Sequence, residues 1–129
     1  MDLGLTGRTA AVAGGSAGLG FATAQALAND GVRVVLCGRD AKRAADAATK
    51  IGHACVGIVA DVSTVSGGES FIAQATKILG QIDILILNSG GPPAGNFAST
   101  DIASYETALQ NGLMSMIAMT KLVVPAMQT

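Results

Sequence analysis

The chain has 129 residues, of which 50% are hydrophobic and 13% are charged, and its formal net charge is −1. This composition can fill the core of one domain, so it excludes an intrinsically disordered chain. Because the sequence has no block of like charge and only 3% aromatic residues, it also argues against nucleic acid or an anionic membrane surface as a partner.

The first predicted strand spans residues 8–13, and a glycine cluster separates it from a predicted helix over residues 18–30. Four apolar residues of this helix are spaced to share one face: Leu19, Ala22, Ala26 and Leu27. The next run, VRVVLC at residues 32–37, is continuous and rich in β-branched residues. Such a run is typical of a strand that is buried on both faces.

An alanine-rich helix is predicted over residues 40–51, and it is followed by a third strand over residues 54–60. Gly67 and Gly68 predict a local loop, because two adjacent glycines weaken a helix. We expect the third helix to begin after this loop and to span residues 69–79.

The fourth strand is predicted over residues 82–87 (IDILIL), before a glycine- and proline-rich loop over residues 88–96. Asp101 opens a long final helix, which Pro125 is expected to kink or end. Strands and helices that alternate in this way predict an α/β fold with a parallel, doubly wound sheet. No linker divides the chain, so residues 1–129 are expected to belong to one domain.

The glycine cluster lies in the stretch VAGGSAGLGFA, directly between the first strand and the first helix. At this place in a doubly wound sheet, glycines permit a tight turn, close approach of a pyrophosphate, and close packing of helix on strand. Free N–H groups at the helix N-terminus attract phosphates. A purely structural role is the alternative. The stretch lacks the Gly-Lys-Ser/Thr ending of a triphosphate-binding loop, so we predict a dinucleotide site formed by Gly14, Gly15, Ser16, Ala17, Gly18, Leu19 and Gly20.

This turn resembles the T-G-x-x-x-G-x-G motif of the short-chain dehydrogenase/reductase family, with Ala13 in place of the threonine. Three further matches follow in the family's order: ADV at residues 60–62, LNSGG at residues 87–91, and Asn111. They resemble the adenine contact, the N-N-A-G motif and the active-site asparagine of the family. The stretch NSGGPPAG resembles its 3-oxoacyl-ACP-reductase-like members. The resemblance implies a Rossmann-type fold and hydride transfer between a nicotinamide cofactor and a carbonyl or alcohol substrate.

Polar and small residues follow the third and fourth predicted strands, where a ligand crevice is expected. The Asp61 carboxylate has two possible roles, which are to accept a hydrogen bond from an adenine amine or to cap the helix expected near Ser63. Asn88 is expected to tie neighbouring backbone segments together and to approach the cofactor ribose. Ser89 and Gly90 depart from the family motif but remain small. The contacts predicted at these two strand ends are Asp61, Val62, Asn88, Ser89 and Gly90.

The end of the second strand indicates which cofactor the chain prefers. The position at which an acid would bind a free ribose 2′-hydroxyl is Gly38, and Arg39 follows it. A guanidinium can bind a 2′-phosphate through two hydrogen bonds, and the Ser16 hydroxyl can add a third. We therefore predict NADP(H). The alternative is that Arg39 is a solvated charge beside Asp40, as Lys42 and Arg43 are expected to be on the following helix.

The family's proton transfer requires a tyrosine four residues before a lysine, and this chain has no such pair. Its single tyrosine, Tyr105, precedes Leu109 at that spacing and also precedes Asn111, the one candidate catalytic residue. Compared with the family, the chain ends after the fourth strand and the following helix, so we expect an incomplete, NADP(H)-binding Rossmann domain without its catalytic half. It is an expressed fragment, a proteolytic remnant or a natural short product. Three interpretations of the chain then remain, which are half of an oxidoreductase, a non-catalytic dinucleotide-binding module, or a purely structural fragment.

Three further features bear on the class of protein. Cys37 and Cys55 lie in apolar runs without short spacing or polar company, so they predict reduced core thiols and no metal site. His53 is expected in a surface turn. The N-terminus has no basic segment followed by an apolar one, and no apolar run has the length of a membrane span. A cytoplasmic protein is therefore expected.

The apolar character of the fourth strand and of residues 112–127 predicts self-association. Lys121 is the single charge in the latter segment, and a helix that is apolar nearly all round needs burial on more than one side. In the family this helix packs between subunits. We expect a homodimer or a larger assembly, weakened more by a charge at Met116 or Val123 than by one at Asp46 or Lys50.

Overall fold

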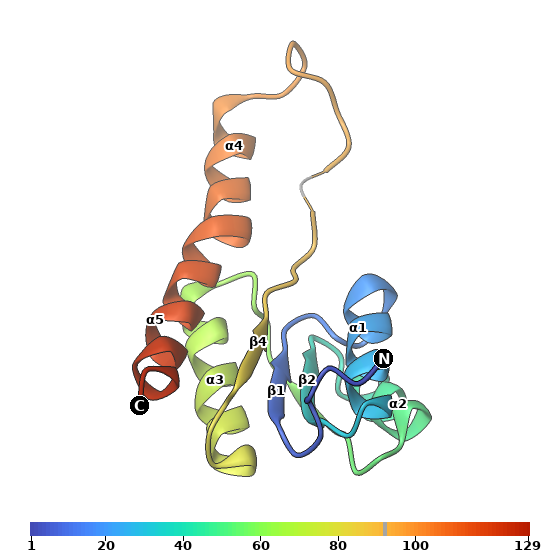
Figure 1. Cartoon of the computed structure of the whole chain (residues 1–129). Helices are drawn as coiled ribbons and strands as arrows, with labels where there is room; N and C mark the ends of the chain where they lie inside the picture. Colours follow the sequence, from blue (N-terminus) through green and yellow to red (C-terminus); the bar gives the residue numbers. More distant parts are fainter. Residues whose placement is uncertain (92) are drawn as a thin grey trace.

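The computed structural model describes residues 1–91 and 93–129 (Figure 1). Pro92, in the loop predicted over residues 88–96, lies outside the described residues. All strand pairings are parallel, in the order β3-β2-β1-β4. The expected doubly wound α/β fold is confirmed, and the described residues form four strands: β1 (Thr9–Val12), β2 (Arg33–Gly38), β3 (Val56–Val59) and β4 (Ile84–Ile86).

Helices cover both faces of the sheet. The helices α1 (Gly18–Asn29) and α2 (Ala41–Ile51) pack on one face, and α3 (Val65–Leu79) and α5 (Ser115–Met127) pack on the other (Figure 1). Successive residues of a strand point to opposite faces. Ala10 therefore belongs to the core beneath α1 and α2, while the next residue of β1 belongs to the core beneath α3 and α5.

The apolar face of α1 differs from the predicted one. The residues of this helix that are buried are Gly20, Ala24 and Ala28, whereas Leu19 is 81% exposed. Small side chains on the inner face let the helix axis lie close to the sheet. The predicted face was therefore wrong, since Ala22 and Ala26 are also exposed and Leu27 is half-buried.

The start of α3 also differs from the prediction. Gly67 and Gly68 do not form a loop but lie in the first turn of the helix, which begins at Val65. The Thr64 side chain accepts a hydrogen bond of 3.0 Å from the Gly67 N–H and so caps the helix. Glycine is required there by close packing, because a Cβ at Gly68 would lie 2.9 Å from Met119 Cγ of α5.

The predicted third strand is too long at its start. His53 and Ala54 have positive φ values of 52° and 60°, so the turn after α2 continues up to Ala54. Cys55 consequently precedes β3 and is half-buried, whereas Cys37 in β2 is fully buried. Both thiols are free, and burial raises the pKa of each to about 11. Each thiol is therefore neutral at physiological pH.

The final helical segment has three parts: α4 (Ile102–Leu109), a π-helical turn (Gln110–Met114) and α5. The helix continues through Pro125 to Met127, so the expectation that this proline ends the helix was wrong, while an expected kink stays a prediction. Val123 is buried against α3, while Ile117 and Leu122 are 42% and 50% exposed. The segment α4 extends beyond the sheet and has no buried residue (Figure 1).

Candidate functional site

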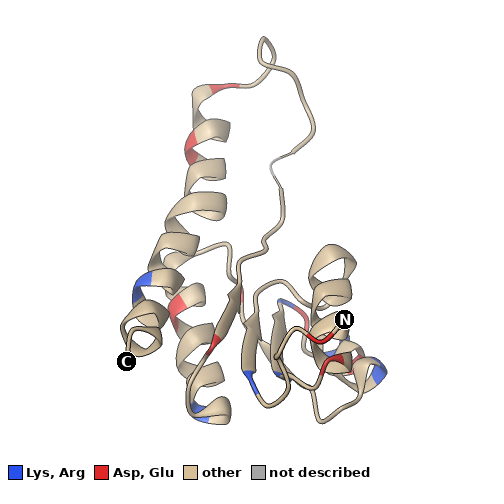
Figure 2. Ribbon diagram, in the orientation of Figure 1, with Lys and Arg blue, Asp and Glu red and all other residues tan. Residues whose placement is uncertain are grey.

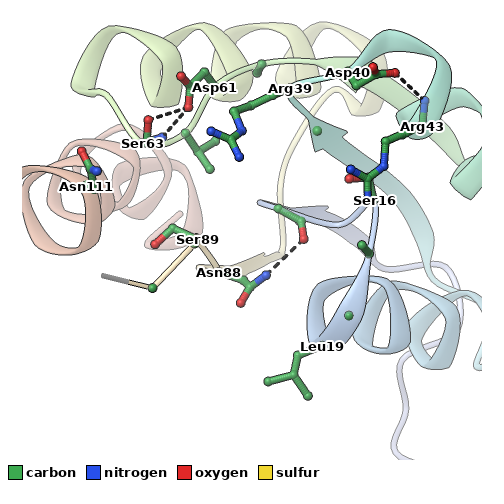
Figure 3. Close-up of a pocket in the computed structure, with 18 residues that line it drawn as sticks. Ser16, Leu19, Arg39, Asp40, Arg43, Asp61, Ser63, Asn88, Ser89 and Asn111 are labelled. Carbon is green, nitrogen blue, oxygen red and sulfur yellow. Dashed lines mark hydrogen bonds between the residues drawn. The ribbon is translucent and has the colours of Figure 1, made fainter. Parts of the chain in front are cut away.

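An open cleft of about 790 Å³ lies at the carboxyl ends of the strands, where a doubly wound sheet binds its ligands. Most of the residues predicted to bind a cofactor line it. They come from the glycine turn, from the ends of β2 and β3, from the segment after β4, and from the π-helical turn (Figure 3). The predicted residues that line the cleft are Gly14, Ser16, Ala17, Gly18, Leu19, Arg39, Asp61, Val62, Asn88, Ser89, Gly90 and Asn111.

Gly15 and Gly20, which were predicted to contact a ligand, do not line the cleft but shape the turn from beneath. The Gly15 N–H donates a hydrogen bond of 2.9 Å to the carbonyl of Cys37. Gly20 faces Gly14 so closely that a Cβ there would collide with the Gly14 carbonyl and lie 2.8 Å from Asn88 Nδ2. Both positions therefore hold the turn against the sheet and require a residue without a side chain.

Asn88 joins the glycine turn to the end of β4. Its side-chain amide donates a hydrogen bond of 3.1 Å to the carbonyl of Gly14, drawn as a dashed line in Figure 3. Gly14 itself has a φ of +60°, which a side chain would strain. The predicted structural role of Asn88 is thus present in the folded chain, and the residue also lines the cleft.

The N-terminus of α1 opens at the cleft without a side-chain cap. Its N-cap is Ala17, which has no side-chain acceptor. By contrast, α2, α3 and α4 each begin with a side chain that accepts a backbone N–H: Asp40, Thr64 and Asp101. The first N–H groups of α1 are therefore left available to an external acceptor at the glycine turn.

The Asp61 carboxylate is oriented by Ser63. Oδ1 accepts hydrogen bonds from the Ser63 N–H at 3.0 Å and from the Ser63 hydroxyl at 2.6 Å. These hydrogen bonds, with a smaller contribution from the charge of Arg39, lower the pKa of Asp61 below its usual value. Since Thr64 caps α3, Asp61 is not the helix cap. Both hydrogen bonds from Ser63 reach Oδ1 and neither reaches Oδ2.

Two guanidinium groups line the same end of the cleft. Arg39 was predicted to lie there, whereas Arg43 was expected to face solvent. The Asp40 carboxylate accepts the Arg43 backbone N–H at 2.9 Å, which starts α2 at the carboxyl end of β2. From this first turn the Arg43 side chain extends toward Ser16 (Figure 3). The missed signal was the position of Arg43 in the first turn of a helix that follows a strand whose carboxyl end lies at the cleft.

The cleft also contains Asn111, which was predicted, and several residues to which the sequence analysis gave no binding role. Gly38 provides room for Ser16, because a Cβ at Gly38 would lie 2.6 Å from the Ser16 hydroxyl oxygen. Asn111 enters from the π-helical turn on the side opposite the glycine turn (Figure 3). The remaining unassigned lining residues are Asp40, Ala60, Ser63 and Gly91.

Comparison with known proteins covers nearly the whole chain. A family model described as short chain dehydrogenase matches residues 8–129. The rhamnolipids biosynthesis 3-oxoacyl-[acyl-carrier-protein] reductase of Pseudomonas aeruginosa is 32% identical over 126 residues, which are 96% of this chain and 49% of that protein. The chain thus spans about half the length of the curated relatives it matches.

Solved structures show the same relation. The L-sorbose reductase of Gluconobacter frateurii, complexed with NADPH and L-sorbose, matches with a TM-score of 0.91 and 25% identity, over 99% of this chain and 50% of that one. The 3-ketoacyl-(acyl-carrier-protein) reductase of Brucella melitensis, complexed with NADH, matches with a TM-score of 0.85 and 25% identity, over 95% of this chain and 50% of that one. Structures similar to this chain therefore hold either nucleotide.

Proposed function

The chain belongs to the short-chain dehydrogenase family, and on that premise we propose that it is the NADP(H)-binding half of an oxidoreductase. The observation that carries the proposal is the open N-terminus of α1 behind a glycine turn at the cleft. Such a terminus supplies unpaired N–H groups and a partial positive charge to a pyrophosphate. The complete protein would transfer hydride between nicotinamide and a carbonyl or alcohol.

Each part of the cofactor has candidate partners along the cleft. The glycine turn would hold the pyrophosphate, and Asp61 with Val62 would hold the adenine. Ser16, Arg39 and Arg43 would hold the 2′-phosphate. Toward the nicotinamide end, the candidates are Asn88, Ser89, Gly90 and Asn111. When bound, NADPH supplies the hydride, while these residues bind and orient it.

The substitution Gly20→Ala tests the glycine turn. We expect it to abolish NADPH binding in calorimetry, because the added Cβ collides with the Gly14 carbonyl and displaces Asn88 Nδ2. Gly112→Ala is the matched control, since a Cβ at that helical position meets nothing within 4 Å. Circular dichroism distinguishes loss of the site from loss of the fold. A folded Gly20→Ala variant that binds NADPH as the unmodified chain does would contradict the proposal.

A second candidate function is a dinucleotide-binding module without catalysis. The observation that favours it is the position of Tyr105, which lies on α4 beyond the sheet and makes an edge-to-face contact with Phe97. Leu109 follows one turn later, where the family chemistry would need a lysine. This candidate predicts binding without turnover.

We also propose that the protein is cytoplasmic and that residues 1–129 form an incomplete domain. Within residues 1–91 and 93–129, none of the helices combines the length and the apolarity needed to cross a bilayer. The full-length protein would bind the carbonyl or alcohol substrate.

We further propose that the chain forms a homodimer or a larger assembly through α5. Lys121 is the single charged residue after Glu106, and Figure 2 shows this helix with little charge. The helix exposes three large apolar side chains, which are Ile117, Leu122 and Val124. Covering a few hundred Å² of such surface contributes several kcal/mol at about 25 cal/mol per Å², before the entropic cost of association.

The expected result is that Leu122→Glu weakens self-association at least about tenfold in analytical ultracentrifugation, as loss of a central apolar contact does. Thr49→Glu on the exposed face of α2 is the control and should leave association unchanged. Val123, predicted above as a test position, is unsuitable because it is buried against α3, and Met116 is half-buried. A monodisperse monomer at micromolar concentration in light scattering would contradict this prediction.

A further inference from the structure

A buried hydroxyl connects two sides of the cleft. Ser115, the first residue of α5, is completely buried, and its hydroxyl donates a hydrogen bond to the carbonyl of Val62. Within the described residues, Thr9 is the only other buried polar or charged residue. A hydroxyl is costly to bury without a partner, so this pairing fixes the distance between α5 and the loop of residues 61–63, here called the β3–α3 loop.

The two ends of this link both reach the cleft. In the β3–α3 loop, Asp61 and Val62 line the cleft. On the other side, Ser115 directly follows the π-helical turn, which places Asn111 in the cleft wall. Ser115 begins α5 four residues after Asn111, so the buried hydroxyl lies at the end of the turn that carries Asn111. A π-helical turn within a longer helix is itself typical of a functional position.

Close packing of α3 and α5 makes the link possible. Gly68 of α3 faces Met119, which lies one turn after Ser115. A side chain at Gly68 would crowd α5, because its Cβ would lie 2.9 Å from Met119 Cγ. With glycine at this position, α5 approaches closely enough for the Ser115 hydroxyl to reach Val62.

We propose that Ser115 is a positioning residue that couples the β3–α3 loop to the turn that carries Asn111. A ligand that orders Asp61 and Val62 then also orders the π-helical turn, since the Val62 carbonyl and the Ser115 hydroxyl move together. The identity of that ligand, the adenosine end of NADP(H), rests on the proposed function. The link itself is a property of the free chain.

Amide hydrogen exchange in the free chain tests the link. Ser115→Ala should increase exchange about tenfold in both residues 61–63 and residues 110–114, because it leaves the buried Val62 carbonyl without its donor. Thr120→Ala is the matched control, since the Thr120 hydroxyl bonds to the Met116 carbonyl within α5 at 2.8 Å. If Ser115→Ala does not fold, Ser115→Cys keeps a similar volume with a weaker donor. Increases no larger than those in Thr120→Ala would overturn the proposal.

Adenosine 2′,5′-bisphosphate tests whether the link transmits binding, because it has the adenosine end of NADPH but no nicotinamide. In the unmodified chain it should slow exchange in both segments, whereas in Ser115→Ala it should slow exchange in residues 61–63 alone. A merely structural Ser115 would give slowing of both segments in both proteins, which would overturn the coupling. Absence of binding by the unmodified chain would refute the proposed function, and the free-chain experiment would still decide whether Ser115 forms the link.

Discussion

NADPH should bind the chain at least about tenfold more tightly than NADH, and Arg39→Asp should remove or reverse this preference. The two cofactors differ in the 2′-phosphate, for which the cleft offers the Arg39 and Arg43 guanidinium groups and the Ser16 hydroxyl. One hydrogen bond to a charged group contributes about 1.5–3 kcal/mol, and each 1.4 kcal/mol changes affinity about tenfold. An aspartate at position 39 would repel the phosphate and could instead accept the free 2′-hydroxyl of NADH.

Calorimetric titration of both cofactors measures this preference. Arg43→Ala should lower NADPH affinity and leave NADH affinity unchanged, because this guanidinium has a partner in one of the two cofactors only. Arg33→Asp is the matched control, since Arg33 starts the same strand β2 at its other end and is exposed. Equal affinities for NADPH and NADH in the unmodified chain would refute the assignment of NADP(H).

The second large effect is expected in catalysis. With a ketone or aldehyde substrate present, the 129-residue chain should oxidise NADPH no faster than the background rate measured without protein. A positioned general acid contributes about 10²–10⁴-fold, and it must lie within hydrogen-bond reach of the reacting oxygen. The single tyrosine, Tyr105, lies on α4 against Phe97, and it does not line the cleft. Asn111 can order a water or a backbone group, but an amide does not donate a proton to an alkoxide.

Absorbance of NADPH over time gives the rate, and calorimetry on the same sample confirms that nucleotide is bound. The Pseudomonas aeruginosa reductase that is 32% identical to the chain serves as the full-length positive control. Substrate-dependent oxidation by the chain that disappears in Tyr105→Phe would show that Tyr105 is a proton donor. The chain would then be a catalyst in its own right and not a binding module.

The local signals in the sequence were sufficient to predict the type and order of the elements. Short apolar runs predicted the strands, and the glycine turn between β1 and α1 predicted the position of the cleft. These predictions succeed because a strand buried on both faces and a turn that approaches a phosphate each impose their residue types within a few positions. The same reasoning predicted that Ser16, Arg39 and Asp61 lie in one site, since the carboxyl ends of parallel strands meet at one edge of the sheet.

Tertiary packing decided what no local pattern contains. The inner face of α1 consists of Gly20, Ala24 and Ala28, which let the helix lie close to the sheet. Gly67 and Gly68 belong to α3, because the Asp61 backbone and α5 leave no space for side chains there. Arg43 reaches the cleft because α2 starts at the carboxyl end of β2.

Ser115 shows the same limit most clearly. From sequence it is a polar residue in an apolar helix, yet in the fold it bonds to Val62, 53 positions earlier. The sequence by itself determined the parallel α/β fold, the glycine turn and most residues of the cleft. The tertiary structure decided which small residues face inward, which guanidinium joins the cleft and which helix is tied to the β3–α3 loop. These outcomes depend on distances between elements far apart in the chain, and such distances follow only from the packing of the whole domain.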